Sequence, residues 1–397
     1  MPRESGFASL RVVALLLCCV GVLLAQAPPR RLVYVLAGQS NIEKLATTTG
    51  GPSLSARTNV LYRLPQPSAW APQTTVPNTP MMVLGDRLGA AHPGDNFEVV
   101  MMAKSGSALL ERNNALGFGY WMNPNNWGDT FALMNAAVPL VGTALRTMPP
   151  NPPPIDEFHI VWGQGETDIL QPLVPGVTQT DYENFAQLLF GVIALVAGGT
   201  QTLQVHLVTP GAIEASWQLP APADALRDAY FNMERNPMAP PTGWSVAITN
   251  VAHHYDLPHF VGSGGLDPHH LSDAAYVTLA NRIADGILTP ASLPKITGVL
   301  VLNGADAKLA TTQPLAPSAF TTAFNNYFTV SDGSPAPIGL TISVQSNTLI
   351  FRAVRNWVSP VNIRYVAGSG FNLNWTSGPL ATPAPAASPL EPFFVKG

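Results

Sequence analysis

The sequence predicts an α/β protein in which a parallel sheet with helices on both sides is followed by a small all-β domain. Two observations lead to this prediction. From about residue 31 to 288, apolar runs of strand length alternate with helical patterns, and several runs are continuously apolar, as in strands covered on both faces. Beyond residue 295, short strand-like runs are separated by Gly, Asn, Ser and Pro.

Strand and helix patterns follow one another through the first region, residues 28–290. Strands are expected at residues 31–37, 97–103, 157–162, 203–208 and 244–251. Helices are expected at residues 130–148, 181–197, 223–235 and 272–288. This alternation predicts a parallel sheet with helices on both of its faces.

The second region, residues 295–397, predicts a small β-sandwich-like domain. Strands are expected at residues 297–302, 338–344, 348–354 and 361–366, and no helical pattern is convincing there. Residues 290–294, which begin and end in proline, predict a linker between the two regions. The Ala- and Pro-rich residues 382–389 predict an extended surface segment.

Composition limits the classes of function. The 397 residues suit one large domain plus a smaller one, and 46% apolar residues suffice for a sizeable core. Charged residues make up only 11%, whereas about a quarter is usual. The net charge of -4 favours neither nucleic acid nor an anionic membrane surface as a partner, and it is compatible with a neutral partner such as a sugar. The sequence does not determine the oligomeric state.

Residues 1–27 predict an export signal peptide and therefore a secreted or periplasmic protein. Arg3 and Arg11 are basic, residues 12–24 form an apolar run too short to span a bilayer comfortably, and Ala25 and Ala27 are small. Cleavage after either alanine fits this pattern. An uncleaved membrane anchor is the alternative, and no membrane association is expected once the signal is removed.

Both cysteines, Cys18 and Cys19, lie within this segment. A lipid anchor on either is disfavoured because Leu17 precedes them where a small residue is expected. The mature chain would hold no disulfide, so its stability must come from its core. It can be neither a cysteine hydrolase nor a thiolate-bound metal protein.

The first candidate for chemistry is Ser40, which follows the first predicted strand and precedes a polar loop. Parallel α/β sheets bind ligands at the carboxyl ends of their strands, and Gly38 permits a tight turn there. Ser40 can act as a nucleophile, and its own N–H can point at a developing oxyanion. The segment is not a G-x-S-x-G elbow, because Ile42 takes the last position. A turn or capping serine is the alternative.

Two further segments offer donors to an oxyanion. Gly106 follows the second predicted strand and can present a backbone N–H, although a simple turn glycine is the alternative. Gln164 follows the third predicted strand and can donate from its side-chain amide without ionising. Glu166 and Asp168, in the same segment, can bind substrate or order the loop, and Asp168 can equally cap a helix.

Asp267 and His270 are the candidate acid and base. We expect them to open the last helix of the first region, with Ser272 as its cap, so that residues three apart share one face. The carboxylate would then contact one imidazole nitrogen while the other nitrogen faces a serine. His269 competes with His270 as the base.

Other interpretations stay open at this point. Three more histidines allow a metal-dependent deacetylase, although no H-E-x-x-H or similar spacing is present: His253, His254 and His259. Four aromatic residues between the second and third strands suit sugar binding, with a buried loop core as the alternative: Phe118, Tyr120, Trp121 and Trp127. A carbohydrate-binding surface protein whose esterase site has decayed would carry the same features.

Taken in order, the segments resemble the SGNH hydrolases, specifically their sialate O-acetylesterase and carbohydrate esterase family 6 branch. That branch carries G-Q-S-N-M, a G-x-S segment, Q-G-E-S-D and D-x-x-H-L. Here residues 38–42 read G-Q-S-N-I, residues 106–107 read G-S, residues 164–168 read Q-G-E-T-D and residues 267–271 read D-P-H-H-L. The departures are Ile42 for Met and Thr167 for Ser, and both leave the catalytic atoms in place.

The resemblance implies a three-layer α/β/α sandwich (SGNH or flavodoxin-like), no cofactor and no metal. It implies hydrolysis of O-acetyl esters on a carbohydrate, either acetylated sialic acid or acetyl-xylan, through an acetyl-serine. The implied catalytic triad is Ser40, Asp267 and His270, because the family spacing selects His270 over His269. The implied oxyanion hole is formed by Ser40, Gly106 and Gln164. Four residues are further candidates for substrate binding or loop ordering: Gln39, Asn41, Glu166 and Trp121.

Overall fold

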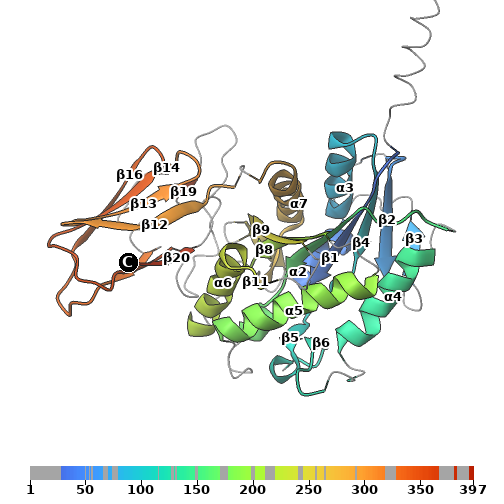
Figure 1. Ribbon diagram of the computed structural model, residues 1–397, viewed down its shortest axis with the longest axis horizontal. Helices are drawn as coiled ribbons and strands as arrows, with labels where there is room; N and C mark the ends of the chain where they lie inside the picture. The colour runs from blue at the N-terminus through green and yellow to red at the C-terminus, as the bar shows by residue number, and fades with distance from the viewer. Residues whose placement is uncertain are drawn as a thin grey trace, which may run out of the picture.

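The computed structural model describes most of the chain that follows the expected signal peptide (Figure 1). The described residues are 28–49, 51–52, 54, 57–65, 70–73, 79–114, 116–126, 129, 132–147, 151–169, 178–197, 202–210, 220–239, 245–254, 257–262, 265–290, 293–317, 328–365, 380–381 and 393–397. The expected signal peptide 1–27, the expected extended segment 382–389 and Trp127 lie outside them. None of the helices formed by the described residues is long and apolar enough to cross a membrane.

A seven-stranded sheet with the strand order β3-β2-β4-β1-β7-β8-β9 forms the centre of the first region. Neighbouring strands are parallel except at the edge pair β2–β3. The bounds are β1 (Arg31–Gly38), β2 (Val60–Pro65), β3 (Trp70–Gln73), β4 (Asn96–Met101), β7 (Glu157–Gly163), β8 (Thr202–Thr209) and β9 (Ser245–His253). The predicted parallel sheet is confirmed, and the edge strands β2 and β3 extend it beyond what the sequence predicts.

Helices cover both faces of this sheet, so the region has three layers (Figure 1). One face packs against α4 (Leu133–Thr147), α5 (Gln179–Ala197) and α6 (Pro220–Arg235). The other packs against α2 (Ser40–Thr47), α3 (Pro80–Ala91) and α7 (Asp273–Leu288). The α/β/α fold class is therefore confirmed, whereas α2 and α3 occupy stretches where no helix is predicted.

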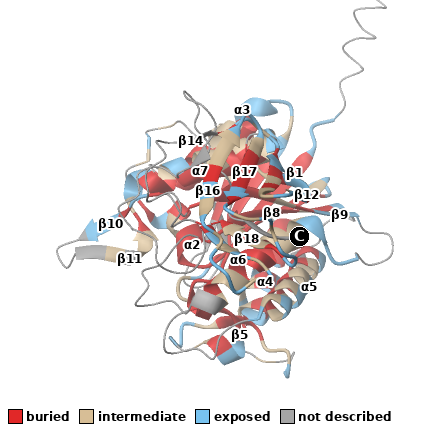
Figure 2. Cartoon of the chain, turned by 90° about the vertical axis from the view of Figure 1, so that its left-hand side faces the viewer, coloured by how far each residue is buried: buried red, intermediate tan, exposed pale blue. Residues whose placement is uncertain are grey.

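Strand β1 explains this layering from its sequence. Every residue of R-L-V-Y-V-L-A-G is buried, and the strand lies at the centre of the sheet. Alternate side chains point to opposite faces: Val33 and Val35 join the core beneath α4–α6, and Tyr34 and Leu36 join the core beneath α2, α3 and α7. Burial on both faces is why residues 32–37 form a continuously apolar run. Figure 2 shows the sheet and the inner sides of its helices as the most buried part of the chain.

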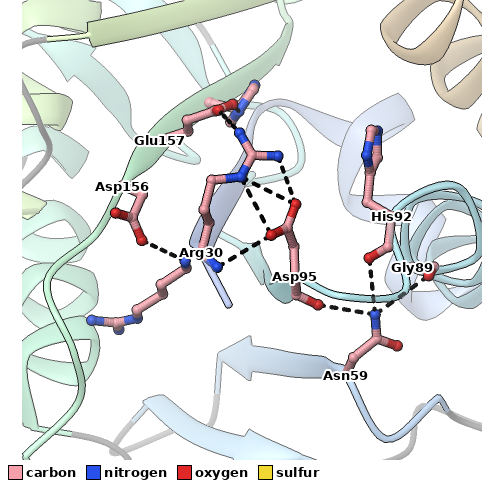
Figure 3. A network of polar contacts seen from close by, with 9 residues as sticks. Arg30, Asn59, Gly89, His92, Asp95, Asp156 and Glu157 are labelled. Carbon is pink, nitrogen blue, oxygen red and sulfur yellow. Dashed lines mark hydrogen bonds and ion pairs between the residues drawn. The ribbon is translucent and has the colours of Figure 1, made fainter. Parts of the chain in front are cut away.

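Charged side chains join the amino ends of the central strands (Figure 3). Arg30, just before β1, donates to both carboxylate oxygens of Asp95, which precedes β4. The same guanidinium forms an ion pair with Glu157 at the start of β7. These contacts connect the amino ends of three neighbouring strands, β4, β1 and β7.

A second, buried ion-pair cluster joins strands β1, β2 and β4. Glu98 on β4 accepts hydrogen bonds of 2.6 Å from Arg31 on β1 and from Arg63 on β2, one at each carboxylate oxygen. All three side chains are almost fully buried. Burying charge is costly unless it is paired, so this cluster depends on all of its members being present.

The C-terminal region is all-β, as predicted. An antiparallel sheet of order β12-β13-β17-β16 contains β12 (Ile296–Asn303), β13 (Asp306–Thr311), β16 (Leu340–Gln345) and β17 (Thr348–Ala353). A second antiparallel sheet contains β15 (Phe328–Ser331), β18 (Asn362–Tyr365) and β20 (Phe393–Lys396). A further pair joins β14 (Ala316–Pro317) to β19 (Leu380–Ala381). One apolar cluster, which includes Leu309, Phe351 and Ile363, connects the two larger sheets.

Candidate active site

A cavity of about 490 Å³ opens at the carboxyl ends of β1 and β7, beside the turn that follows β4. Its volume lies within the range of about 300–1,000 Å³ that small-molecule sites occupy. The predicted residues Ser40, Gly106 and His270 line it. A second cavity, of about 480 Å³ beside α5, is lined almost wholly by apolar side chains and offers no reactive group.

Ser40 is the first residue of α2, where the sequence predicts a polar loop. Gly38 ends β1 with φ +130°, and a Cβ there would lie 2.0 Å from the carbonyl oxygen of Gly163, so only glycine fits this turn. Gln39 then caps the helix in an extended conformation. The N–H of Ser40 has no acceptor within its own helix, because the first turn of a helix leaves its N–H groups free. The positive end of the helix dipole also lies at Ser40.

Asp267 and His270 lie on a strand that ends just before the predicted helix, so they do not share the expected helical face. They belong to β11 (Gly265–Leu271), which pairs with β10 (His259–Gly262), and α7 begins only at Asp273. In this hairpin His259 pairs with Leu271 and Val261 pairs with Leu266, so residues 267–270 bulge out of the ladder. The expected cap is confirmed, because the Ser272 side chain accepts the N–H of Ala275.

The bulge brings the predicted acid and base into contact. Oδ2 of Asp267 lies 2.9 Å from Nδ1 of His270, and Oδ1 accepts the backbone N–H of His269 at 2.8 Å and of His270 at 3.1 Å. A proton on Nδ1 satisfies this contact and leaves Nε2 as the basic nitrogen. Burial raises the pKa of the Asp267 carboxyl, but hydrogen bonds from the His269 N–H and the His270 ring outweigh burial and hold that pKa below its usual value.

Asn41 connects the serine segment to the acid–base segment. Its amide donates to Oε1 of Glu166 at 2.9 Å and to the carbonyl oxygen of His269 at 3.2 Å. Its own oxygen accepts from the Tyr276 hydroxyl at 2.8 Å. Asn41 is buried, so its role in this structure is to hold α2, β11 and the loop after β7 together.

Glu166 is a buried residue in the wall of the cavity. Burial raises the pKa of this carboxyl, and the hydrogen bond from Asn41 offsets only part of that effect. Oε2 is buried without a hydrogen-bond partner within the described structure. Oε1 also lies 3.7 Å from Nε2 of His254.

Gly106 forms the tip of the turn after β4. Its φ of +70° favours glycine, and a Cβ there would lie 2.5 Å from the ring of Phe118. The turn is joined to the serine segment by two contacts: Lys104 donates its backbone N–H to Gly38 O, and Ser105 donates from its N–H and hydroxyl to the Glu43 carboxylate on α2. Gly106 is therefore held beside Ser40 at the wall of the cavity.

The structure corrects the prediction for Gln164. Its amide donates to Asp168 at 2.6 Å and to Ser107 O at 3.2 Å, while its oxygen accepts from the Tyr182 hydroxyl at 2.7 Å. The side chain is fully buried. Since both amide hydrogens are used inside the protein, Gln164 orders the loop after β7 and does not serve as an oxyanion donor.

Gln39 supports the same loop from α2. Its side-chain oxygen lies 3.3 Å from the backbone N–H groups of Gly165 and Thr167, which donate to it. Gln39 also donates its own N–H to Gly163 O. The expected loop-ordering role of Gln39 matches these contacts, although the residue also borders the cavity.

The structure also corrects the prediction for Trp121. This residue lies in the core on β6 (Tyr120–Met122), fully buried, with its ring edge-on to Trp162 at a centroid distance of 5.5 Å. It cannot contact substrate there. Phe118 is instead the aromatic residue at the cavity, where it is 58% exposed. Both residues belong to the aromatic stretch predicted to bind sugar, but the sequence alone does not indicate which of them is exposed.

Ser40 and His270 border the same cavity, but within the described structure no hydrogen bond joins the serine hydroxyl to the imidazole ring. Such contacts are often long in unliganded enzymes and tighten when substrate binds. Lys44 and Lys104 also line the cavity, and neither was a predicted site residue. In the part of the chain that the structure describes, neither ammonium group has an ion-pair partner.

The additional histidines are arranged separately. His259 lies 3.0 Å from the carbonyl oxygen of Asp267 through its Nδ1 atom, whereas His254 faces Glu166. The described residues contain no group of three or more His, Cys, Asp or Glu side chains that could hold a metal ion.

Comparisons with known proteins connect this arrangement to solved structures. No protein-family model matches the sequence, and no curated protein sequence matches it. The chain is similar in structure to XAC1771, a carbohydrate acetylesterase from Xanthomonas citri, with a TM-score of 0.59 and 16% identity over 91% of this chain and 80% of that chain. The two proteins share a fold.

Two weaker similarities accompany this one. NanS matches with a TM-score of 0.40 and 14% identity over 66% of this chain and 98% of that chain. A family two carbohydrate esterase from Clostridium thermocellum matches with a TM-score of 0.33 and 13% identity over 66% of this chain and 65% of that chain.

Proposed function

We propose that this chain is an exported serine esterase that removes acetyl groups from carbohydrates through an acetyl-serine intermediate. The observation that carries the proposal is the contact of 2.9 Å between Asp267 and His270 at the cavity where Ser40 begins α2. The fold shared with a carbohydrate acetylesterase supports the substrate class. Export, to the cell exterior or the periplasm, follows from the signal-like residues 1–27.

In the proposed reaction, the Ser40 hydroxyl attacks the acetyl carbonyl carbon while Nε2 of His270 takes its proton. The tetrahedral intermediate collapses when the sugar oxygen leaves with that proton. Water then attacks the acetyl-enzyme and gives a proton to His270. The second tetrahedral intermediate collapses, His270 returns its proton to the Ser40 oxygen, and acetic acid leaves and ionises to acetate in solution. Asp267 keeps the ring oriented and stabilises the imidazolium.

The backbone N–H groups of Ser40 and Gly106 are the proposed oxyanion donors. Ser40 contributes the first N–H of α2, where the helix dipole also favours negative charge. Gly106 contributes from the turn that Lys104 and Ser105 join to the serine segment. Preorganised donors of this kind are each worth roughly 100-fold to 1,000-fold in rate.

The lysines favour an acidic sugar as the substrate. Lys44 and Lys104 line the cavity and, within the described residues, form no ion pair. Their charges would attract a substrate carboxylate. The exposed ring of Phe118 offers a face for the sugar. Of the two acetylated substrates considered, an acetylated sialic acid fits these groups better than acetyl-xylan, which is neutral.

The test is acetate release from a panel of acetylated acidic and neutral glycans. We expect the mature protein to release acetate and Ser40→Ala to release almost none. Ser343→Ala, a serine replacement on β16 away from the cavity, should retain full activity. Absence of acetate release from every glycan would contradict the proposed activity, and equal rates on acidic and neutral glycans would contradict the substrate preference.

A further inference from the structure

Helix α6 lies between the C-terminal β domain and the loop that borders the candidate active site (Figure 1). Two sets of its side chains face different partners. Asp228 and Phe231 contact the β domain, whereas Leu226 and Tyr230, one helical turn apart, contact the loop after β7.

The contact with the β domain is charged and largely buried. Arg364 on β18 binds Asp228 through both terminal nitrogens, with one hydrogen bond of 2.7 Å, and its Nε lies 3.6 Å from Asp224. The Arg364 and Asp228 side chains are 16% and 10% exposed. Phe231 packs against the apolar cluster of the β domain beside this pair. A two-pronged arginine contact fixes orientation as well as distance.

The end of α6 is held to the start of the β domain as well. Arg235 donates to the carbonyl oxygen of Ile296 at 3.0 Å, and Lys295 pairs with Glu234. Glu234 also accepts the backbone N–H of Asn250 on β9 at 3.1 Å. The helix is therefore fixed along its length between the β domain and the central sheet.

On its other side α6 sets the position of the active-site loop. The Tyr230 hydroxyl lies 2.9 Å from both the backbone nitrogen and the carbonyl oxygen of Gln164. Leu226 covers Gly165, where a Cβ would lie 2.5 Å from the leucine side chain. Gly165 has φ +126°, a conformation that favours glycine, and its lack of a Cβ lets Leu226 pack directly against the loop backbone.

The loop in turn contacts the serine segment. Gly165 and Thr167 donate their backbone N–H groups to Gln39, the residue before Ser40. Glu166 accepts from Asn41, the residue after Ser40. Any displacement of α6 would therefore reach the residues on both sides of the nucleophile through one short loop.

We propose that Arg364 is a positioning residue: by holding Asp228, the β domain fixes α6, and α6 fixes the Gln164–Asp168 loop against Ser40. This inference rests on the proposed esterase function for its kinetic consequence. It assigns the β domain a role in setting active-site geometry, in addition to any contribution to stability.

The test compares Arg364→Gln and Asp228→Asn with Arg352→Gln. Arg352 is the matched control, because it pairs with Asp306 inside the β domain and is 67% exposed. Active sites are first titrated with an aryl phosphonate so that kcat refers to folded, competent enzyme. We expect kcat on an aryl acetate to fall roughly tenfold in both test variants with KM nearly unchanged, since small displacements at a reacting centre are costly. Arg364→Lys should recover part of the loss.

Amide hydrogen exchange over residues 164–169 supplies a readout that does not need activity. We expect exchange there to be several-fold faster in Arg364→Gln and unchanged in Arg352→Gln, because the loop loses its support. Unchanged exchange in Arg364→Gln, or unchanged kcat per titrated site, would overturn the inference. Failure of the wild-type protein to hydrolyse any acetyl ester would instead overturn the proposed function, and the exchange result would still decide the inference.

Discussion

The two ends of the central sheet use polar residues in opposite ways. At the amino ends, Glu98 pairs with both Arg31 and Arg63 in a buried cluster, and Arg30 pairs with Asp95 and Glu157. At the carboxyl ends, two serines, two histidines and two lysines border an open cavity. The same strands therefore carry charged residues that stabilise the fold at their amino ends and residues that can bind or react with a substrate at their carboxyl ends.

We therefore expect residues at the two ends of the sheet to affect two different properties, the free energy of unfolding and the rate of turnover. Substitutions at the amino ends should change the free energy of unfolding and leave turnover alone. Substitutions at the cavity should change turnover and leave the free energy of unfolding nearly unchanged.

The largest effect is expected at His270. His270→Ala should lower kcat/KM about 1,000-fold to 10,000-fold, because the base that receives the Ser40 proton is lost. His269→Ala, which removes the neighbouring ring at the same cavity, should cost less than about tenfold on this scale. Initial rates on an aryl acetate measure both. The base assignment is wrong if the two variants exchange these results.

At the amino ends of the strands, Glu98→Gln should reduce the free energy of unfolding by about 3 kcal/mol, because two buried guanidinium groups lose their countercharge. Urea unfolding measures the change. Asp306→Asn, which breaks an ion pair with the exposed Arg352, should cost under about 1 kcal/mol. Turnover per active site should stay at the wild-type level in Glu98→Gln, and a fall in turnover would break the separation of the two edges.

Gly106→Ala should lower kcat about 100-fold, because a Cβ at φ +70° meets the Phe118 ring and shifts a proposed oxyanion donor. Gly117→Ala is a matched control: Gly117 has the same φ of +70°, but a Cβ there meets no atom within 4 Å. Strain alone should therefore leave turnover in Gly117→Ala near the wild-type value. Equal losses in both variants would remove the argument for a role of the Gly106 N–H.

The smallest expected effect is the pH dependence of the stability that Asp95 contributes at the amino ends of the strands. The hydrogen bond from Arg30 outweighs burial and holds the pKa of Asp95 below its usual value. A lowered folded-state pKa means that ionised Asp95 stabilises the fold above about pH 4 and that this contribution disappears as the pH falls through the folded-state pKa. Arg30 is 45% exposed, so screening limits the contribution to under about 1 kcal/mol.

Asp95→Asn should accordingly flatten the loss of stability between about pH 5 and pH 2, and the difference from wild type should shrink in high salt. Urea unfolding at a series of pH values measures this. A difference that grows as the pH falls would contradict the assigned direction of the Asp95 shift.

Much of the fold could be predicted because its signals are local. The continuously apolar β1 and the helical pattern of α7 contain enough information in one stretch of chain. Strand β13, by contrast, was missed because D-A-K-L-A-T places only alternate residues in the core and contains a single residue type that favours strands, Thr311.

The site was predictable in its residue types but less so in its geometry. The contact between Asp267 and His270 was expected on a helix, whereas a bulge fixed by pairing with β10 produces it, and that pairing is not visible in residues 267–270. The Gln164 amide donates to Asp168 and to Ser107 O, and the latter follows a different strand of the sheet. Phe118 is exposed whereas Trp121, three residues later, is buried in the core. These features depend on contacts between distant parts of the chain.

Covalent labelling can identify Ser40 as the nucleophile of the esterase reaction. The mature protein is treated with an aryl phosphonate, and the adduct is located by peptide mass spectrometry. We expect one phosphonyl group per chain on Ser40, loss of esterase activity in proportion to labelling, and at least about 100-fold slower labelling of His270→Ala. Full esterase activity in a protein labelled at Ser40, or an adduct on another residue that accounts for the inhibition, would contradict this assignment.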